Sequence, residues 1–156
     1  MEKSIEMKFL HEPVELGYDD LIAESTDTGR IYKDPQGKEY PSVTTVLKIL
    51  SEEAIQKWRA RVGEEEANRV SRIASSRGTT VHNIIEKYLA NDPDYIKDEM
   101  PHNIQTFKDV QPILDECVTK IYCQEAPLYS KHLQLAGRVD LVGQWKGVDS
   151  IIDWKT

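Results

Sequence analysis

The spacing of apolar residues predicts one amphipathic helix with particular clarity, over residues 79–90. Its apolar side chains recur at positions i, i+3, i+4, i+7 and i+8, which is the pattern of a buried helical stripe. They are Val81, Ile84, Ile85, Tyr88 and Leu89. At 100° per residue His82 lies at the edge of this stripe and Glu86 one step further out. The run Asn91-Asp92-Pro93-Asp94 ends the helix.

Three further helical segments are indicated. Ser42 is a suitable N-cap for a helix with apolar residues at Val43, Val46, Leu47 and Leu50. Residues 51–76 are expected to form one or two helices, with a break at Gly63. Residues 103–122 are expected to form a helix that Pro112 kinks or restarts. Its predicted buried residues are Phe107, Val110, Leu114, Val118 and Ile121.

Strand signals lie on either side of these helices. Asp34-Pro35-Gln36-Gly37 is a turn sequence, and it predicts a short hairpin between residues 30–32 and 38–40. From residue 125 the apolar period changes to two, with Leu133, Leu135, Val139 and Leu141 on one face and Gln134, Arg138 and Asp140 on the other. After a turn at 145–149, Ile152 and Trp154 alternate with Asp153 and Lys155 in a second strand. The pattern therefore predicts an α/β chain.

Composition and charge limit the class of protein. The chain has 156 residues, 39% hydrophobic and 30% charged, which suits one globular domain and excludes collagen-like or wholly disordered chains. Residues 1–28 are acidic and weakly periodic, and we expect an N-terminal arm there. No apolar run is long enough to span a bilayer, and no secretory or transit leader is recognisable. Two cysteines make no disulfide framework, and Cys117 and Cys123 would lie on nearly opposite faces of a helix. We expect small core cysteines in a reduced, cytoplasmic compartment.

The distribution of charge matters more than its sum. The net charge of −7 argues against a protein that coats nucleic acid with its whole surface. Residues 51–90 nevertheless carry seven basic and six acidic side chains, and residues 126–156 carry four and three. Any contact with phosphate is therefore expected in a local site built from these two segments.

The two C-terminal strands carry the candidate chemistry. Asp153 and Lys155 project from one face because residues i and i+2 of a strand share a face. Pairing of the strands brings Asp140 alongside Asp153. Two converging carboxylates suit Mg²⁺, and a neighbouring lysine suits phosphodiester hydrolysis. The alternative is an ordinary cross-strand ion pair on a solvated face.

These residues resemble the PD-(D/E)xK nuclease family, and in particular its RecB-type exonuclease branch. Gly137-Arg138-Val139-Asp140 is followed thirteen residues later by Asp153-Trp154-Lys155-Thr156, with Val139 in place of the signature proline. Arg77-Gly78-Thr79, leading into His82 and Glu86, resembles the branch's metal-site helix. The runs at 40–47 (YPSVTTVL) and 125–130 (EAPLYS) resemble the subgroup of phage exonucleases and the mitochondrial genome maintenance exonuclease.

The resemblance implies a restriction-endonuclease-like core with N-terminal helices over residues 29–156. It implies an Mg²⁺- or Mn²⁺-dependent DNA exonuclease that acts on single-stranded ends, in DNA recombination and repair. A phage-encoded form would work in the host cytoplasm. By this resemblance Asp140, Asp153, His82 and the Trp154 carbonyl bind metal, Lys155 is the catalytic lysine, and Glu125 lies near the site.

Each assignment has a simpler alternative. Without the motif that precedes it, His82 would be read as a packed, hydrogen-bonded histidine, and Glu125 alone as a surface residue at the start of a strand. Arg77, Lys131 and Arg138 are candidates for binding substrate phosphates, and each could instead form a structural ion pair. Among the tryptophans Trp58 and Trp154 fit core positions, which leaves Trp145 as the candidate for base stacking.

The chain stops directly after the predicted catalytic strand, where the family continues with a helix and a strand. We expect either a fragment of a longer product or a short protein that a partner chain or dimer completes at the exposed sheet edge. The alternative function is a non-catalytic DNA-binding or interaction module. A hydrolase for another phosphoester is less favoured, because no nucleotide-pocket motif is present.

Overall fold

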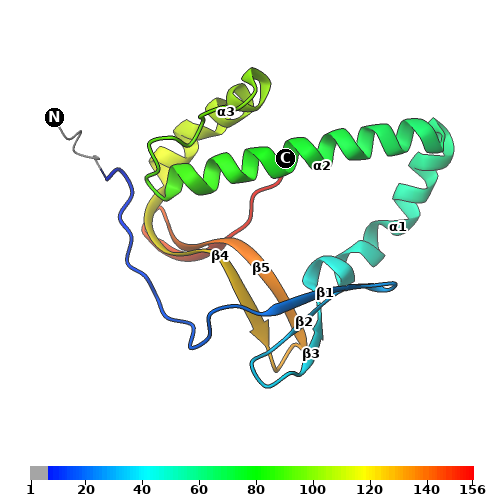
Figure 1. Ribbon diagram of the computed structural model, residues 1–156, viewed down its shortest axis with the longest axis horizontal. Helices are drawn as coiled ribbons and strands as arrows, with labels where there is room; N and C mark the ends of the chain where they lie inside the picture. Colours follow the sequence, from blue (N-terminus) through cyan, green and yellow to red (C-terminus); the bar gives the residue numbers. More distant parts are fainter. Residues whose placement is uncertain (1–6) are drawn as a thin grey trace. The chain divides into compact units, whose positions relative to one another are not determined.

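The computed structural model describes residues 7–156, which form three helices and two three-stranded sheets (Figure 1). The sheets have the strand orders β1-β2-β3 and β4-β5-β6. This confirms the predicted α/β class. The chain divides into two compact units, one of residues 15–70 and 125–139, the other of residues up to Val14 with Ser71–Gln124 and Asp140–Thr156.

The first unit contains the predicted short hairpin. Strand β1 (Ile22–Thr26) pairs antiparallel with β2 (Gly29–Lys33), which pairs antiparallel with β3 (Glu39–Pro41). Tyr32 and Tyr40 are paired across β2 and β3 and are both buried. The buried Asp34 carboxylate closes the turn, because it accepts hydrogen bonds from two backbone N–H groups of the turn and from the Tyr40 hydroxyl.

The predicted helix start at Ser42 and the break at Gly63 are both confirmed. The Ser42 hydroxyl accepts a hydrogen bond from the Thr45 N–H at the start of α1 (Val43–Val62). Gly63, at φ 90°, ends α1, and α2 (Glu64–Leu89) follows directly. The predicted apolar stripe of α1 is present but is not buried, since Leu47 and Leu50 are 54% and 83% exposed. Periodicity alone gives a helix an apolar face without deciding what covers it.

The second unit is built around the C-terminal half of α2. All five residues of the predicted stripe are buried, and they pack with α3 (Pro101–Cys117) and with strands β4 (Val118–Ser130), β5 (Leu135–Trp145) and β6 (Val148–Ile152). Phe107 and Leu141 are almost completely buried in this core. The predicted C-terminal hairpin is confirmed, with a turn at Lys146 and Gly147 between β5 and β6.

The prediction of one helix over 103–122 is wrong after Cys117. Val118 and Ile121 are buried as predicted, but they lie in β4. The run of β-branched and aromatic residues from Val118 to Tyr122 favours a strand, although its apolar spacing continues the helical pattern. Cys117 therefore ends α3 while Cys123 lies in β4, and both are free cysteines. Pro112 lies within α3, which continues past it.

The predicted loose N-terminal arm is also wrong for much of its length. Residues 22–26 form β1, and Phe9 and Leu21 are buried. Residues 10–12 lie along the edge of β4, where the Ile121 N–H donates to the Leu10 carbonyl and the Glu12 N–H to the Ile121 carbonyl. These contacts produce no apolar periodicity in the sequence, because each depends on a strand that is remote in sequence. Residues 1–6 of the predicted arm lie outside the described residues.

Gly143 is the position in β5 where a side chain is least compatible with this fold. A Cβ atom there would lie 2.3 Å from the Lys120 carbonyl oxygen of β4, whereas a Cβ at Gly137 would make only an ordinary 3.5 Å contact with Val43. We predict that Gly143→Ala lowers the free energy of unfolding by about 1–3 kcal/mol, because β4 and β5 must separate. The matched Gly137→Ala should be neutral or slightly stabilising. Urea denaturation followed by circular dichroism measures both, and equal effects would contradict the close approach.

Candidate active site

The antiparallel register of β5 and β6 brings the two predicted carboxylates together. Leu141 is paired with Ile152, so the next step along the same register sets Asp140 opposite Asp153. The carboxyl groups of Asp140 and Asp153 lie close enough that each shifts the pKa of the other. Leu141, the neighbour of Asp140, is buried in the core, which directs Asp140 to the opposite face of the sheet. The predicted convergence of these two acids is therefore confirmed.

The second strand is shorter than the sequence predicts. β6 ends at Ile152, and residues 153–156 continue without regular structure. Alternation nevertheless persists, because Ile152 and Trp154 both pack against the core while Asp153 and Lys155 form an ion pair. The Trp154 N–H donates to Asp140 Oδ2 over 2.7 Å, which fastens the segment to β5.

His82 reaches the same group of side chains from α2. Its Nδ1 lies 3.4 Å from Asp140 Oδ1. The position follows from the amphipathic stripe, since burial of Val81, Ile84 and Ile85 fixes the rotation of the helix and leaves His82 at the edge that faces β5. We call the group of His82, Asp140, Asp153 and Lys155 the acidic cluster.

The acidic cluster opens from the protein interior to solvent. The side chain of Asp140 is 11% exposed, that of His82 29%, that of Asp153 46% and that of Lys155 83%. A bound ligand could therefore approach from the side of Lys155 and Asp153, while Asp140 and His82 form the floor.

The two carboxyl groups have pKa values displaced in opposite directions. Burial raises the pKa of Asp140, and the neighbouring Asp153 raises it further, although the Trp154 N–H acts in the other direction. Burial would also raise the pKa of Asp153, but the Lys155 ammonium and the neighbouring Asp140 carboxyl lower it. The inner carboxyl thus holds a proton more readily than the outer one. Two acids in contact need a proton or a cation between them.

Three of the remaining candidates of the predicted nuclease site belong to the other compact unit: Arg138, Glu125 and Lys131. Arg138 donates to the Glu125 carbonyl oxygen over 2.9 Å and to Asp20 over 2.6 Å. It therefore forms a structural ion pair, which was the alternative to phosphate binding. Glu125 is a half-buried residue of β4 with a positive φ of 48°. Lys131 is exposed in the turn between β4 and β5.

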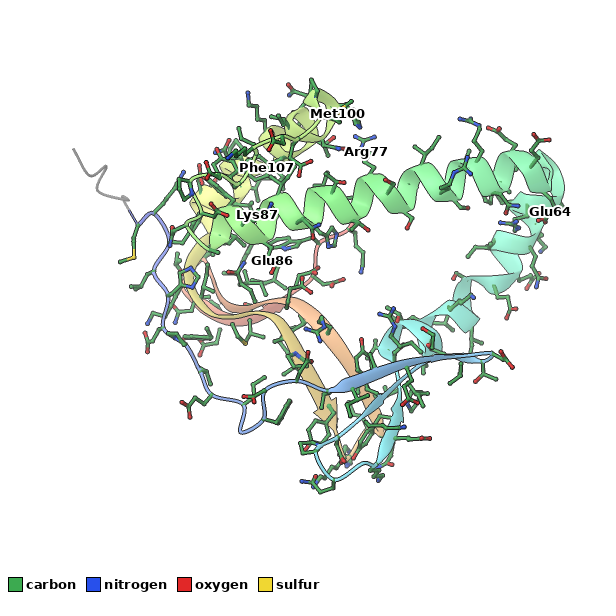
Figure 2. All side chains as sticks on the ribbon, in the orientation of Figure 1. Glu64, Arg77, Glu86, Lys87, Met100 and Phe107 are labelled. Carbon is green, nitrogen blue, oxygen red and sulfur yellow. The ribbon has the colours of Figure 1, made fainter. Side chains whose placement is uncertain are left out.

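Arg77 lies on a different side of α2 from His82. Its guanidinium donates to the Thr106 hydroxyl of α3 over 2.7 Å. Figure 2 shows its side chain on the α3 side of α2, with Glu86 on the other side. At 100° per residue Arg77 and His82 are about 140° apart around the helix. Gly78 is the residue of this motif that comes close to the C-terminal segment, because a Cβ there would lie 2.9 Å from Thr156 Oγ1.

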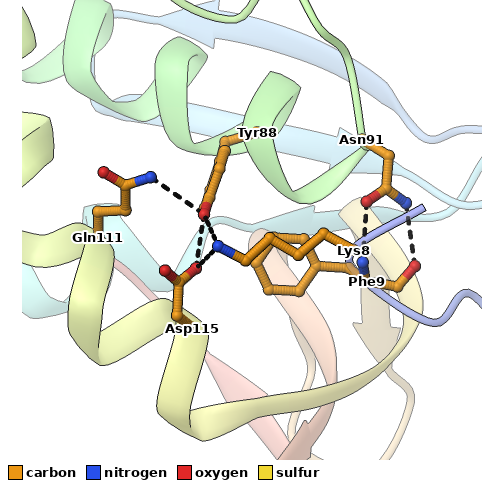
Figure 3. Close-up of polar contacts among 6 residues, drawn as sticks. All are labelled: Lys8, Phe9, Tyr88, Asn91, Gln111 and Asp115. Carbon is orange, nitrogen blue, oxygen red and sulfur yellow. Dashed lines mark hydrogen bonds and ion pairs between the residues drawn. The ribbon is translucent and has the colours of Figure 1, made fainter. Parts of the chain in front are cut away.

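A polar network that the sequence does not reveal holds the end of α2 in place (Figure 3). The Tyr88 hydroxyl donates to Asp115 and lies 2.6 Å from the ammonium of Lys8, which also pairs with Asp115 at 2.8 Å. Asn91 exchanges two hydrogen bonds with the backbone of Phe9. These partners are far apart in sequence, so no local pattern could have identified them. They fasten the helix two turns after His82.

The donor set of the acidic cluster fits a hard divalent cation in its chemistry. Carboxylate oxygens suit Mg²⁺, and an added imidazole is acceptable to Mn²⁺. As they stand, no three His, Cys, Asp or Glu side chains within residues 7–156 are arranged to hold one metal ion. Asp140 Oδ2 accepts the Trp154 N–H, and Asp153 contacts Lys155. Binding an ion here would require the Asp153–Lys155 ion pair to open, whereas the Trp154 N–H engages only one of the two Asp140 oxygens.

Comparison with known proteins adds no assignment. No protein-family model matches the chain, and no curated protein matches it. Within the described part of the chain, no helix has the length and apolar character needed to cross a membrane.

Replacing Asp140 tests the electrostatic conflict within the cluster. Asn at this position keeps an oxygen that can accept the Trp154 N–H but removes a buried negative charge beside Asp153. We predict that Asp140→Asn, in EDTA at pH 7, raises the melting temperature by about 2–4 °C, the shift that ~1 kcal/mol produces in a chain of this size. Because the pKa of Asp140 is raised, its ionisation costs stability as pH rises, so the gain should shrink in acid as wild-type Asp140 becomes protonated.

The control is Asp149→Asn on β6. Asp149 is exposed and accepts hydrogen bonds from the Tyr122 hydroxyl and the Gln144 amide, and these bonds lower its pKa. Its substitution should lower the melting temperature. A destabilised Asp140→Asn variant at neutral pH would contradict the repulsion between Asp140 and Asp153.

Proposed function

We propose that this protein is a divalent-metal-dependent deoxyribonuclease of the restriction-endonuclease-like PD-(D/E)xK class. In this proposal it removes nucleotides from single-stranded DNA ends in the cytoplasm, in recombination and repair. One observation carries the proposal: Asp140 contacts both His82 and Asp153, and Asp153 contacts Lys155. An imidazole, two acids and an amine from three separate segments thus meet where a hydrolytic phosphodiester site needs them.

In the proposed site Asp140, Asp153 and His82 hold Mg²⁺ or Mn²⁺, and the Trp154 carbonyl remains a candidate for a fourth ligand. When bound, such an ion offsets phosphate charge and lowers the pKa of a water molecule. The Trp154 N–H keeps the Asp140 carboxylate oriented through its 2.7 Å hydrogen bond. Burial of the helix stripe around His82 holds the imidazole in place, so little ordering is left for the moment of reaction.

Lys155 is the proposed catalytic lysine. Its side chain is the most exposed of the cluster, and its ammonium is paired with Asp153. Release from Asp153 would let it orient the attacking water or stabilise the negative charge that develops on the pentavalent phosphorus. Arg77 and Arg138 have weaker support, because Arg77 donates to Thr106 and Arg138 is paired with Asp20. The proposed roles of Glu125 and Lys131 rest on the resemblance alone.

Hydrolysis of end-labelled single-stranded DNA tests the activity. We predict Mg²⁺- or Mn²⁺-dependent shortening of the labelled strand that EDTA abolishes. Lys155→Ala should lower the rate by at least ~100-fold, the scale of one lost electrostatic stabiliser, and leave DNA binding intact. The matched control is Lys146→Ala in the β5–β6 turn, an exposed lysine whose Glu116 partner lies 3.7 Å away. Equal rates for the two variants would refute the role of Lys155.

The alternative is a non-catalytic DNA-binding or interaction module. It is favoured by the fact that both acidic groups already have partners within the protein. Asp153 is paired with Lys155, and Asp140 with the Trp154 N–H. β6 also lies at the edge of its sheet, where a partner chain or second copy could add a strand. Retardation of DNA without any metal-dependent shortening would support this module and contradict the nuclease.

Metal binding can be tested without catalysis. An ion that binds only the folded state stabilises it by mass action, by about 2.7 kcal/mol at a hundred times its dissociation constant. We therefore predict that Mn²⁺ raises the melting temperature by ~5–10 °C. The effect should be lost in Asp153→Asn and retained in Asp149→Asn. An equal shift in both variants would place the ion elsewhere.

A further inference from the structure

The section of α2 that precedes His82 is unusually exposed to solvent for a helix. Every side chain from residue 68 to residue 77 is exposed, and at the two ends of this section Asn68 accepts from Arg59 and Arg77 donates to Thr106. Helices of this kind need another source of stability or a partner. The same section contains no acidic residue, although the whole chain carries 27. From Ala67 to Ile85 the charged side chains are Arg69, Arg72 and Arg77.

The face of α2 that carries His82 continues along this section as a row of hydroxyl groups. At 100° per residue Ser71 and Ser75 lie within about 20° of His82 around the helix axis, and Thr79 lies about 60° away. Arg72 lies about 80° away, on the same side as Thr79. These four residues and His82 belong to one compact unit of the chain.

None of these four side chains contributes a polar contact to the described part of the fold. Within residues 7–156 the hydroxyls of Ser71, Ser75 and Thr79 and the guanidinium of Arg72 have no hydrogen bond or ion pair with the protein. The other two arginines differ from Arg72 in this respect. Arg69 is paired with Glu66 at 2.7 Å, and Arg77 donates to Thr106. Arg72 is therefore the arginine of this section whose charge is uncompensated.

We propose that this face of α2, formed by Ser71, Arg72, Ser75 and Thr79, binds the phosphodiester backbone of the DNA strand that enters the acidic cluster. The inference rests on the proposed nuclease function and names the path of its substrate. Serine, threonine and arginine are the side chains that contact phosphate oxygens without reading sequence. The distance from Arg72 to His82 is about 15 Å along the helix, which spans roughly four phosphates at the ~3.4 Å rise of a stacked strand.

The path also explains how an acidic protein could bind a polyanion. The acid-free section of α2 separates the three glutamates of its first turn from Glu86. A strand on the His82 face would thus meet hydroxyl groups and Arg72 before it reaches the carboxylates. Phosphate contact is then local, in keeping with the net charge of −7.

Binding is measured separately from cleavage. The probe is a fluorescein-labelled 20-nucleotide oligothymidylate, and anisotropy is followed in Ca²⁺ and in EDTA over a series of salt concentrations. Arg72→Glu and Ser75→Glu should each weaken binding at least tenfold at low salt, and Arg72→Ala should reduce the salt slope by about 0.7, the value for one phosphate contact on a single strand. Arg72→Lys should restore most of the affinity.

The control is Lys108→Glu on α3, which changes the net charge as Arg72→Glu does and also alters an exposed residue. It should bind like the wild type, and melting curves establish that all variants fold. Wild-type affinity in Arg72→Glu and Ser75→Glu, an equal loss in the control, or no binding by the wild type would overturn the proposal.

The same variants separate this proposal from the proposed function. A wild type that binds the oligonucleotide through Arg72 but never shortens it would refute the nuclease and leave the binding face standing. A wild type that cleaves, with an unchanged KM in Arg72→Glu, would leave the nuclease standing and refute the binding face.

Discussion

The register between β5 and β6 is the constraint on which the candidate site depends. Because Leu141 is paired with Ile152, Asp140 and Asp153 must meet at the end of the hairpin. A slip of one residue would turn Asp140 to the core and Leu141 to solvent, which burial of Leu141 forbids. Hydrophobic burial on one face of the sheet therefore specifies a juxtaposition of charges on the other. The turn at Gly147 and the Trp154 N–H, bonded to Asp140, hold this register at its two ends.

The acidic cluster lowers the stability of the folded state. Two carboxyl groups are in contact, and the inner one is largely shielded from water, so ionisation of both is unfavourable. Replacing such a pair by an apolar contact would serve stability better. Conflicts of this kind persist mainly where a site needs them, which is why the cluster supports a functional interpretation more strongly than a surface ion pair would.

α2 differs along its length in how much of its surface is packed against the rest of the protein. Its C-terminal turns are fixed by an apolar stripe and by the network of Lys8, Tyr88 and Asp115. The section from residue 68 to residue 77 has only exposed side chains and no acidic residue. His82 lies where the fixed part begins. Rigid support beneath a chemical group and an accessible surface before it are the features that a site for a long polymeric substrate requires.

The sequence by itself determined the elements whose signals are local. The hairpin at 30–40, the cap at Ser42, the break at Gly63 and the stripe of 81–89 follow from turn chemistry and periodicity, and so does the meeting of Asp140 and Asp153. Only the tertiary structure decided which apolar faces are covered, where α3 becomes β4, and that Phe9 is buried beside residues some eighty positions away. It also assigned Arg138 to Asp20 and Arg77 to Thr106. The physical reason is that alternation and capping act between near neighbours, whereas burial and ion pairing depend on which distant segments the folded chain brings into contact.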